Sequence, residues 1–184
     1  MNRSISIPTT EAAPDRHVAG MVRRSLLPFI ALALFLAFAG YTVMRGEQRA
    51  RQCTRQLQHI YLALELHEID HGALPHMAFY PNDPRHSSDS MLVVLDPYAL
   101  TGAIGLCPGD HDVVRAHGLS YIWNANLNGQ TLQEQDPNTW LVAELSALSD
   151  EVPAPHLGRY LTLYADGRVV RSRKPPVGLT EIRP

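Results

Sequence analysis

The sequence predicts an α+β protein in which one long N-terminal helix packs by its second half on a small antiparallel β-sheet. Three observations support this prediction. An uncharged apolar run fills residues 26–44, an amphipathic stretch continues it without a break to His71, and short runs rich in aromatic and β-branched residues follow after residue 118. A long helix followed by consecutive antiparallel strands is typical of the α+β class.

We divide the chain into four segments. The apolar run is long enough to span the hydrocarbon core of a bilayer, at about 28 Å for 19 residues. A signal peptide also has basic residues before an apolar run, but no convincing small-x-small cleavage site follows this one. The predicted segments are a disordered tail at 1–25, a transmembrane helix at 26–44, a head at 45–173 that includes an amphipathic helix at 45–71, and a Pro-rich, irregular tail at 174–184.

The predicted helix 45–71 carries two apolar stripes. One stripe steps by four and three residues through Cys53, Leu57, Ile60, Leu64, His67 and His71, and the other through Leu62, Leu66 and Ile69 on nearly the opposite face. A helix lying on a single sheet needs only one apolar stripe. We therefore expect the second stripe to be covered as well, either by loops of the head or by a helix of another subunit. Gly72 and Pro75 supply the stop signals for this helix.

Four runs after residue 118 have the composition of strands. They are Leu119–Trp123, Thr139–Leu145, Tyr160–Ala165 and Arg168–Arg173. Asp166 and Gly167 separate the last two runs and predict a tight two-residue hairpin of type I′, in which both turn residues have positive φ.

The stretch His67-Glu68-Ile69-Asp70-His71 fits the H-E-x-x-H pattern of zinc peptidases. In those enzymes two His one turn apart bind zinc, and the Glu activates the attacking water. The context argues against that function, because Gly72 and Pro75 end the helix directly after the second His and both His continue the apolar stripe. A small zinc hydrolase is the less favoured alternative, and we expect no enzymatic activity, no catalytic residue and no cofactor.

Composition excludes some binding partners and leaves others open. The net charge of −2, with 18% charged residues, gives no reason to expect nucleic-acid binding. Asp110 and Asp112 flank His111 and form either a calcium-binding turn or a solvated one.

The two cysteines, Cys53 and Cys107, are either inert core residues, half of a metal site or one disulfide. Arginines flank the apolar run on both sides, so the positive-inside rule leaves its orientation open.

A series of motifs in the head resembles a known family. His156 is followed by nine residues and then by Asp166-Gly167. This pattern is similar to the C-terminal signature, "His, nine residues, Asp-Gly", of the prepilin-type, pilin-like proteins abundant in planctomycetes. Further stretches match the same family in the same order, namely Cys53–Pro75, Leu106-Cys107-Pro108, Ser120-Tyr121 through Asn124, and Val142-Ala143-Glu144. Together the matches cover residues 45–172.

The resemblance implies the fold of type IV pilins and type II secretion pseudopilins, with no enzymatic activity. It implies an anchor in the inner (cytoplasmic) membrane, with the N-terminus in the cytoplasm and the head extracytoplasmic. Its cysteines, at the positions of Cys53 and Cys107, imply a disulfide between helix and head. The implied partners are the lipid bilayer and other pilin-like subunits or secretion machinery.

The N-terminus departs from the family pattern. Prepilins carry Gly-Phe-Thr-Leu-Ile-Glu before the apolar run, and the aligned residues here are Gly20-Met21-Val22-Arg23-Arg24-Ser25. The Phe and the Glu are missing, which argues against cleavage and filament assembly. The chain is predicted to be a single-pass, pseudopilin-like structural protein, a minor component of a type II secretion or pilus-like system. The alternative is an anchored binding module that uses loops 76–90 and 126–138.

Overall fold

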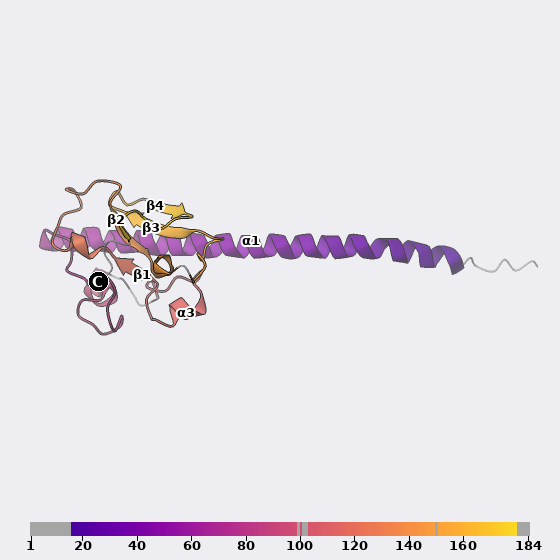
Figure 1. Ribbon diagram of the computed structural model, residues 1–184, viewed down its shortest axis with the longest axis horizontal. Helices are drawn as coiled ribbons and strands as arrows, with labels where there is room; N and C mark the ends of the chain where they lie inside the picture. The colour runs from indigo at the N-terminus through magenta and orange to yellow at the C-terminus, as the bar shows by residue number, and fades with distance from the viewer. Residues whose placement is uncertain (1–15, 99, 101–102, 150, 180–184) are drawn as a thin grey trace, which may run out of the picture. The chain divides into compact units, whose positions relative to one another are not determined.

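The computed structural model describes residues 16–98, 100, 103–149 and 151–179, with side chains from Pro28 onward. The chain divides into two compact units, Met1–Thr42 and Val43–Pro184, and the sheet belongs to the second (Figure 1). The predicted α+β class is confirmed, since α1 contacts a four-stranded antiparallel sheet. The elements are α1 (Arg16–His71), α2 (Met91–Val94), α3 (Asp112–Arg115), β1 (Tyr121–Trp123), β2 (Trp140–Glu144), β3 (Tyr160–Tyr164), β4 (Val169–Ser172) and the 3₁₀ turns Asp96–Tyr98, Ala125–Leu127 and Leu145–Leu148.

Helix α1 begins ten residues earlier than the sequence indicated. Residues 16–25, expected to belong to a disordered tail, continue the helix toward its N-terminus. Extending a helix that has already formed costs little, because each added residue brings one hydrogen bond, and residues such as Met21 and Arg23 are good helix formers. Residues 1–15 of the expected tail lie outside the described part of the chain. At the other end Gly72, with φ of 77°, donates its N–H to the Glu68 carbonyl at 2.7 Å and ends the helix as expected.

The sheet has the strand order β1-β2-β3-β4, and every neighbouring pair is antiparallel. The pairing register shifts between Trp140 and Val142, so β2 contains a bulge at Leu141. After the bulge the side chains alternate again, which places Glu144 on the same face as Val142, the face that packs on α1. This bulge therefore determines which way an acidic side chain at the end of β2 points.

The hairpin between β3 and β4 differs from the predicted type I′ turn. Leu163 pairs with Val169, and the Gly167 N–H donates to the Tyr164 carbonyl at 2.9 Å. Gly167 has φ of 79°, whereas Leu157 is the only non-glycine residue with positive φ in the described part of the chain. The loop is thus Ala165–Gly167 with a single left-handed residue. A type I′ turn would force Asp166 into that strained region, while this turn lets its Oδ1 accept the Arg168 N–H at 3.1 Å.

The main core lies between α1 and one face of the sheet. Cys53, Leu57, Ile60 and Leu64 are completely buried there, as the first predicted stripe requires. A second, smaller cluster covers the opposite face of the sheet and is made of Ile122, Trp140, Ala143, Ala147 and Leu179. Leu179 comes from the Pro-rich segment 174–184, so this irregular segment packs on the sheet through Leu179, whereas Val177 is exposed. Residues 180–184 of that segment lie outside the described residues.

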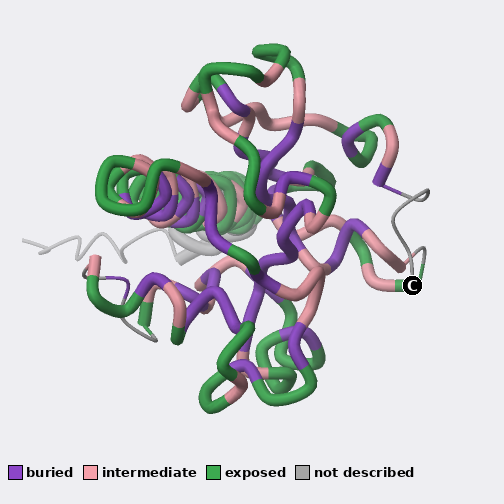
Figure 2. Tube along the Cα trace, turned by 90° about the vertical axis from the view of Figure 1, so that its left-hand side faces the viewer, coloured by how far each residue is buried: buried purple, intermediate pink, exposed green. Residues whose placement is uncertain are grey.

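The second apolar stripe of α1 is not covered by the head. Leu62, Leu66 and Ile69 are 55%, 47% and 77% exposed. Figure 2 shows α1 nearly end-on, with exposed residues along the side that is turned away from the rest of the head. The expectation that loops of the head cover this stripe is therefore wrong. Residues Thr131–Gln133 only flank it, across an open groove of about 860 Å³.

Candidate functional site: a buried polar cluster at the disulfide

Cys53 of α1 and Cys107 form a disulfide, which confirms the pairing implied by the resemblance. The two Cα atoms are 5.2 Å apart and both residues are completely buried. The bond closes a loop with a sequence separation of 54 residues. In the chain-entropy model a loop of that length contributes about 4 kcal/mol to stability. The disulfide thus attaches the second half of α1 to the loop that precedes β1.

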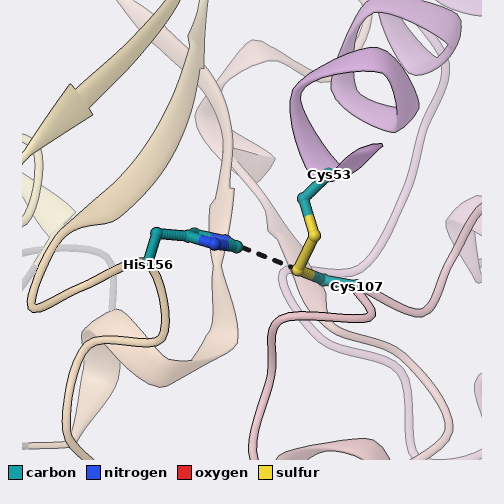
Figure 3. Close-up of side chains that lie close together, drawn as sticks. All are labelled: Cys53, Cys107 and His156. Atoms are coloured by element: carbon teal, nitrogen blue, oxygen red, sulfur yellow. Dashed lines mark hydrogen bonds between the residues drawn. A yellow bond between two sulfur atoms is a disulfide. The ribbon is translucent and has the colours of Figure 1, made fainter. Parts of the chain in front are cut away.

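His156 lies directly against this disulfide. Its Nε2 is 3.5 Å from Cys107 Sγ, and Figure 3 shows the imidazole edge pointing at the sulfur. The same Nε2 is only 2.6 Å from Glu144 Oε1. A disulfide sulfur carries no proton, and Nε2 carries one at most, so we assign the hydrogen bond to the shorter contact, with Glu144 as acceptor.

Glu144 is completely buried at the end of β2 and both of its carboxylate oxygens are used. Oε1 accepts from His156, and Oε2 accepts the backbone N–H of Leu161 in β3 at 3.0 Å. Cys107 Sγ lies 3.8 Å from Oε1. A buried carboxylate is costly unless its oxygens are paired, and here the pairing groups come from two segments far along the chain.

A strained turn holds His156 in position. Leu157 adopts φ of 55°, a left-handed conformation that costs a branched residue about 1 kcal/mol or more. The His156 carbonyl accepts from Arg171 Nη2 at 2.7 Å, and the same guanidinium binds Glu47 of α1 through Nη1 at 2.8 Å. Gly109 leaves room for the ring, because a Cβ at this position would lie 2.4 Å from His156 Cε1. Strand β4, helix α1 and the turn after Cys107 therefore all position the imidazole.

Asp110 is a second buried carboxyl beside the cluster. It is 7% exposed, and neither carboxyl oxygen has a hydrogen-bond partner among the described residues. One of its oxygens, Cys107 Sγ and an oxygen of Glu144 lie within 4.8 Å of one another. Burial raises the pKa of Asp110 to about 7, a shift that the nearby Ser120 hydroxyl only partly offsets and the Glu144 charge increases.

The proposed calcium turn does not bring its two carboxylates together. Asp110 points into the protein, whereas the side chain of Asp112, in the first turn of α3, is fully exposed. His111 between them is exposed, and its Nε2 lies 3.1 Å from the Pro153 carbonyl oxygen. Asp110 and Asp112 therefore do not share a coordination site.

The H-E-x-x-H residues lie at the end of α1. The rings of His67 and His71 are 4.4 Å apart, and His67 Nδ1 is 3.1 Å from the Ala73 carbonyl oxygen. Glu68 Oε1 accepts the Leu132 N–H at 3.0 Å, and Asp70 Oδ2 accepts from the Tyr98 hydroxyl. Each of these contacts anchors the helix end to a neighbouring loop. The carboxylate that a zinc peptidase would use on water is here bonded to the backbone.

The two loops proposed for partner binding, 76–90 and 126–138, meet through Asn128. Its Oδ1 accepts from the Met77 N–H and the Trp123 indole, and its Nδ2 donates to the Met77 carbonyl at 3.0 Å. An open pocket of about 680 Å³ lies next to the second loop and includes Asn126 and Asn138 in its lining. Asn128 thus has a structural role, because its side chain joins the two loops.

Sequence reasoning identified Cys53, Cys107, His156, Asp166 and Gly167, and the structure separates their roles. The cysteines and His156 meet in the buried cluster, while Asp166 and Gly167 form the β3–β4 turn. The functions of Glu144 and Asp110 as buried partners of this cluster were missed. A usable signal existed for Glu144, because a charged residue within the apolar run of Thr139–Leu145 predicts either an exposed position or a buried partner.

No family model, curated protein or solved structure matches this chain. The architecture itself, a long apolar N-terminal helix followed by a small four-stranded antiparallel sheet, is consistent with a pilin-like fold.

Proposed function

We propose that this protein is a single-pass, membrane-anchored structural subunit of the pseudopilin type, a minor component of a type II secretion or pilus-like system. In this proposal the first half of α1 crosses the inner membrane, the N-terminus stays in the cytoplasm and the head is extracytoplasmic. Among the described residues, one helix is long and apolar enough to cross a membrane, and none of its apolar window is buried. The disulfide also favours an oxidising compartment for the head.

The observation that carries the proposal is the uncovered stripe of Leu62, Leu66 and Ile69. Exposure of a contiguous apolar surface to water costs free energy. Burial of that surface against another apolar surface removes this cost. The head leaves this stripe free, although it buries the opposite side of the same helix completely. We assign the stripe to contact with the head of a neighbouring subunit that is anchored in the same membrane.

Photo-crosslinking in native membranes tests this assignment. A photoreactive amino acid at Leu66 is expected to give discrete crosslinked species that contain this chain or another helical membrane subunit. The matched control is Asp112, whose side chain is fully exposed on α3 of the head. Equal crosslinking at Leu66 and Asp112, or none at either, contradicts a specific contact. Labelling of a Ser88→Cys variant by a membrane-impermeant maleimide in intact cells checks the orientation, since Ser88 is exposed on the head.

A further inference from the structure

The buried cluster contains two side chains that can bind a metal, His156 and Glu144, in addition to the two cysteines of the disulfide. Sγ of Cys53, Sγ of Cys107 and a ring nitrogen of His156 lie within 4.8 Å of one another. Glu144 Oε1 lies 3.8 Å from Cys107 Sγ and 2.6 Å from His156 Nε2. Two sulfurs, one imidazole nitrogen and one carboxylate oxygen are the atom types that bind zinc in tetrahedral sites.

We propose that two-electron reduction of the Cys53–Cys107 disulfide converts this cluster into a tetrahedral zinc site with Cys53, Cys107, His156 and Glu144 as ligands. Zinc then holds α1 to the head in place of the disulfide. This inference does not depend on the proposed assembly function.

The separations from Cys107 Sγ to the nitrogen and oxygen donors fit such a site. A zinc ion about 2.3 Å from sulfur and about 2.0–2.1 Å from nitrogen or oxygen gives tetrahedral S···N and S···O edges of about 3.6 Å. The corresponding distances from Cys107 Sγ are 3.5 Å to His156 Nε2 and 3.8 Å to Glu144 Oε1. The two sulfurs, bonded to each other in the oxidised protein, must separate to about 3.8 Å in the zinc site.

One contact in the cluster has to open. His156 Nε2 and Glu144 Oε1 are 2.6 Å apart because a proton lies between them, and zinc ligands of these types are about 3.4 Å apart. The ion takes the place of that proton. Nδ1 of His156, which has no hydrogen-bond partner among the described residues, then carries the ring proton, so the ligand is a neutral imidazole.

The surroundings exclude water and offer one hydrogen-bond donor to the Cys107 sulfur. Cys53, Cys107 and Glu144 are 0% exposed and His156 is 1% exposed. The Gly109 N–H points at Cys107 Sγ from 3.4 Å, a donor position that stabilises negative charge on sulfur. Leu161 N–H holds the other oxygen of Glu144 and so orients this ligand.

A dithiol reductant gives the Cys53–Cys107 disulfide two electrons and two protons and is itself oxidised to a disulfide. A phosphine gives two electrons, and one water molecule supplies the two protons and the oxygen of the phosphine oxide. Zn²⁺ then displaces the two thiol protons, and its double positive charge is matched by the two thiolates.

The test uses the full chain in detergent micelles. One sample is kept oxidised and another is reduced with a phosphine. Both receive Zn²⁺, are passed over a desalting column and are analysed for protein-bound zinc. The reduced chain is expected to retain one zinc ion and the oxidised chain none. Equal zinc in both samples places the metal elsewhere, for instance at His67 and His71, and overturns the proposal, as does the absence of zinc from the reduced chain.

Variants and a cobalt spectrum identify the ligands. Reduced His156→Ala is expected to lose most of the bound zinc, whereas His111→Ala, at an exposed histidine, keeps it. Co²⁺ in the reduced wild-type chain should give the intense visible bands of a tetrahedral site and thiolate-to-cobalt charge transfer in the near-ultraviolet. This readout does not depend on the folding of a variant. Weak octahedral bands without charge transfer, or full zinc retention by His156→Ala, overturn the proposal.

Discussion

His156 Nε2 lies 2.6 Å from Glu144 Oε1, and both side chains are completely buried beside the disulfide that joins α1 to the head. The pair connects the end of β2 to the turn before β3 at the point where α1 is attached. A buried polar pair stabilises the fold only while its hydrogen bond is intact. Removal of either side chain leaves the other without this bond, which costs free energy of folding.

Replacement of Glu144 by Leu should therefore destabilise the head. The change leaves both the imidazole of His156 and the N–H of Leu161 without an acceptor, at a cost on the order of 3 kcal/mol. Urea unfolding followed by Trp fluorescence measures it, with the exposed Glu134→Gln as the matched control. A midpoint equal to that of the control would show that the buried pair contributes no net stability.

The double variant Cys53→Ala, Cys107→Ala should lose about 4 kcal/mol of unfolding free energy, because its unfolded chain is no longer cross-linked and has more conformational entropy. The same denaturation experiment measures this loss against the oxidised wild-type protein. In that wild-type protein, extracted without reductant, neither cysteine should react with a thiol reagent. Labelling of both residues in the native membrane would contradict the disulfide itself.

Asp110 should make the oxidised head less stable as the pH rises from 4 to 7. Its pKa is raised from 3.8 to about 7 in the folded protein, so the folded state binds more protons than the unfolded state in this window. Stability then falls with increasing pH and levels off above about 7, with a limit on the order of 4 kcal/mol. Thermal unfolding over this pH range should show that slope.

Asp110→Asn should remove the slope and raise the stability at neutral pH, because the amide stays uncharged in both states. Asp112→Asn, at the fully exposed neighbouring carboxylate, should leave the slope in place. A wild-type profile that is flat between pH 4 and 7 would mean that Asp110 finds a compensating partner in solution.

The mass of the N-terminal peptide, taken from the native membrane, should correspond to a chain that is not cut after Gly20. Arg23 and Arg24 stand where prepilins have apolar residues, and the Phe and Glu of the prepilin motif are absent. A peptide that begins at Met21 and carries an N-methyl group would reverse this expectation and make assembly into a filament the leading function.

The strands and the helix stop were predictable because their signals are local. Four runs of β-formers, the cap at Gly72 and the first apolar stripe each depend on residues within a few positions of one another. The structure contains the strands and the cap, and it buries the stripe from Cys53 to Leu64, whereas His71 at its end is exposed. Local signals also explain why the start of α1 and the type of the β3–β4 turn were predicted wrongly. The apolar pattern marks where a helix is amphipathic but not where it first becomes helical, and Asp-Gly occurs both in type I′ turns and in the three-residue loop found here.

By itself, the sequence determined the α+β class, the apolar run before the head and the stripe of α1 that would be buried. Only the tertiary structure decided that the second stripe stays exposed and that Glu144, His156 and Asp110 meet at the disulfide. The physical reason is the range of the interactions. Periodicity and propensity act over one or two turns, whereas this cluster depends on the bulge in β2, the strained turn at Leu157 and the packing of α1, which join segments that are far apart in the chain.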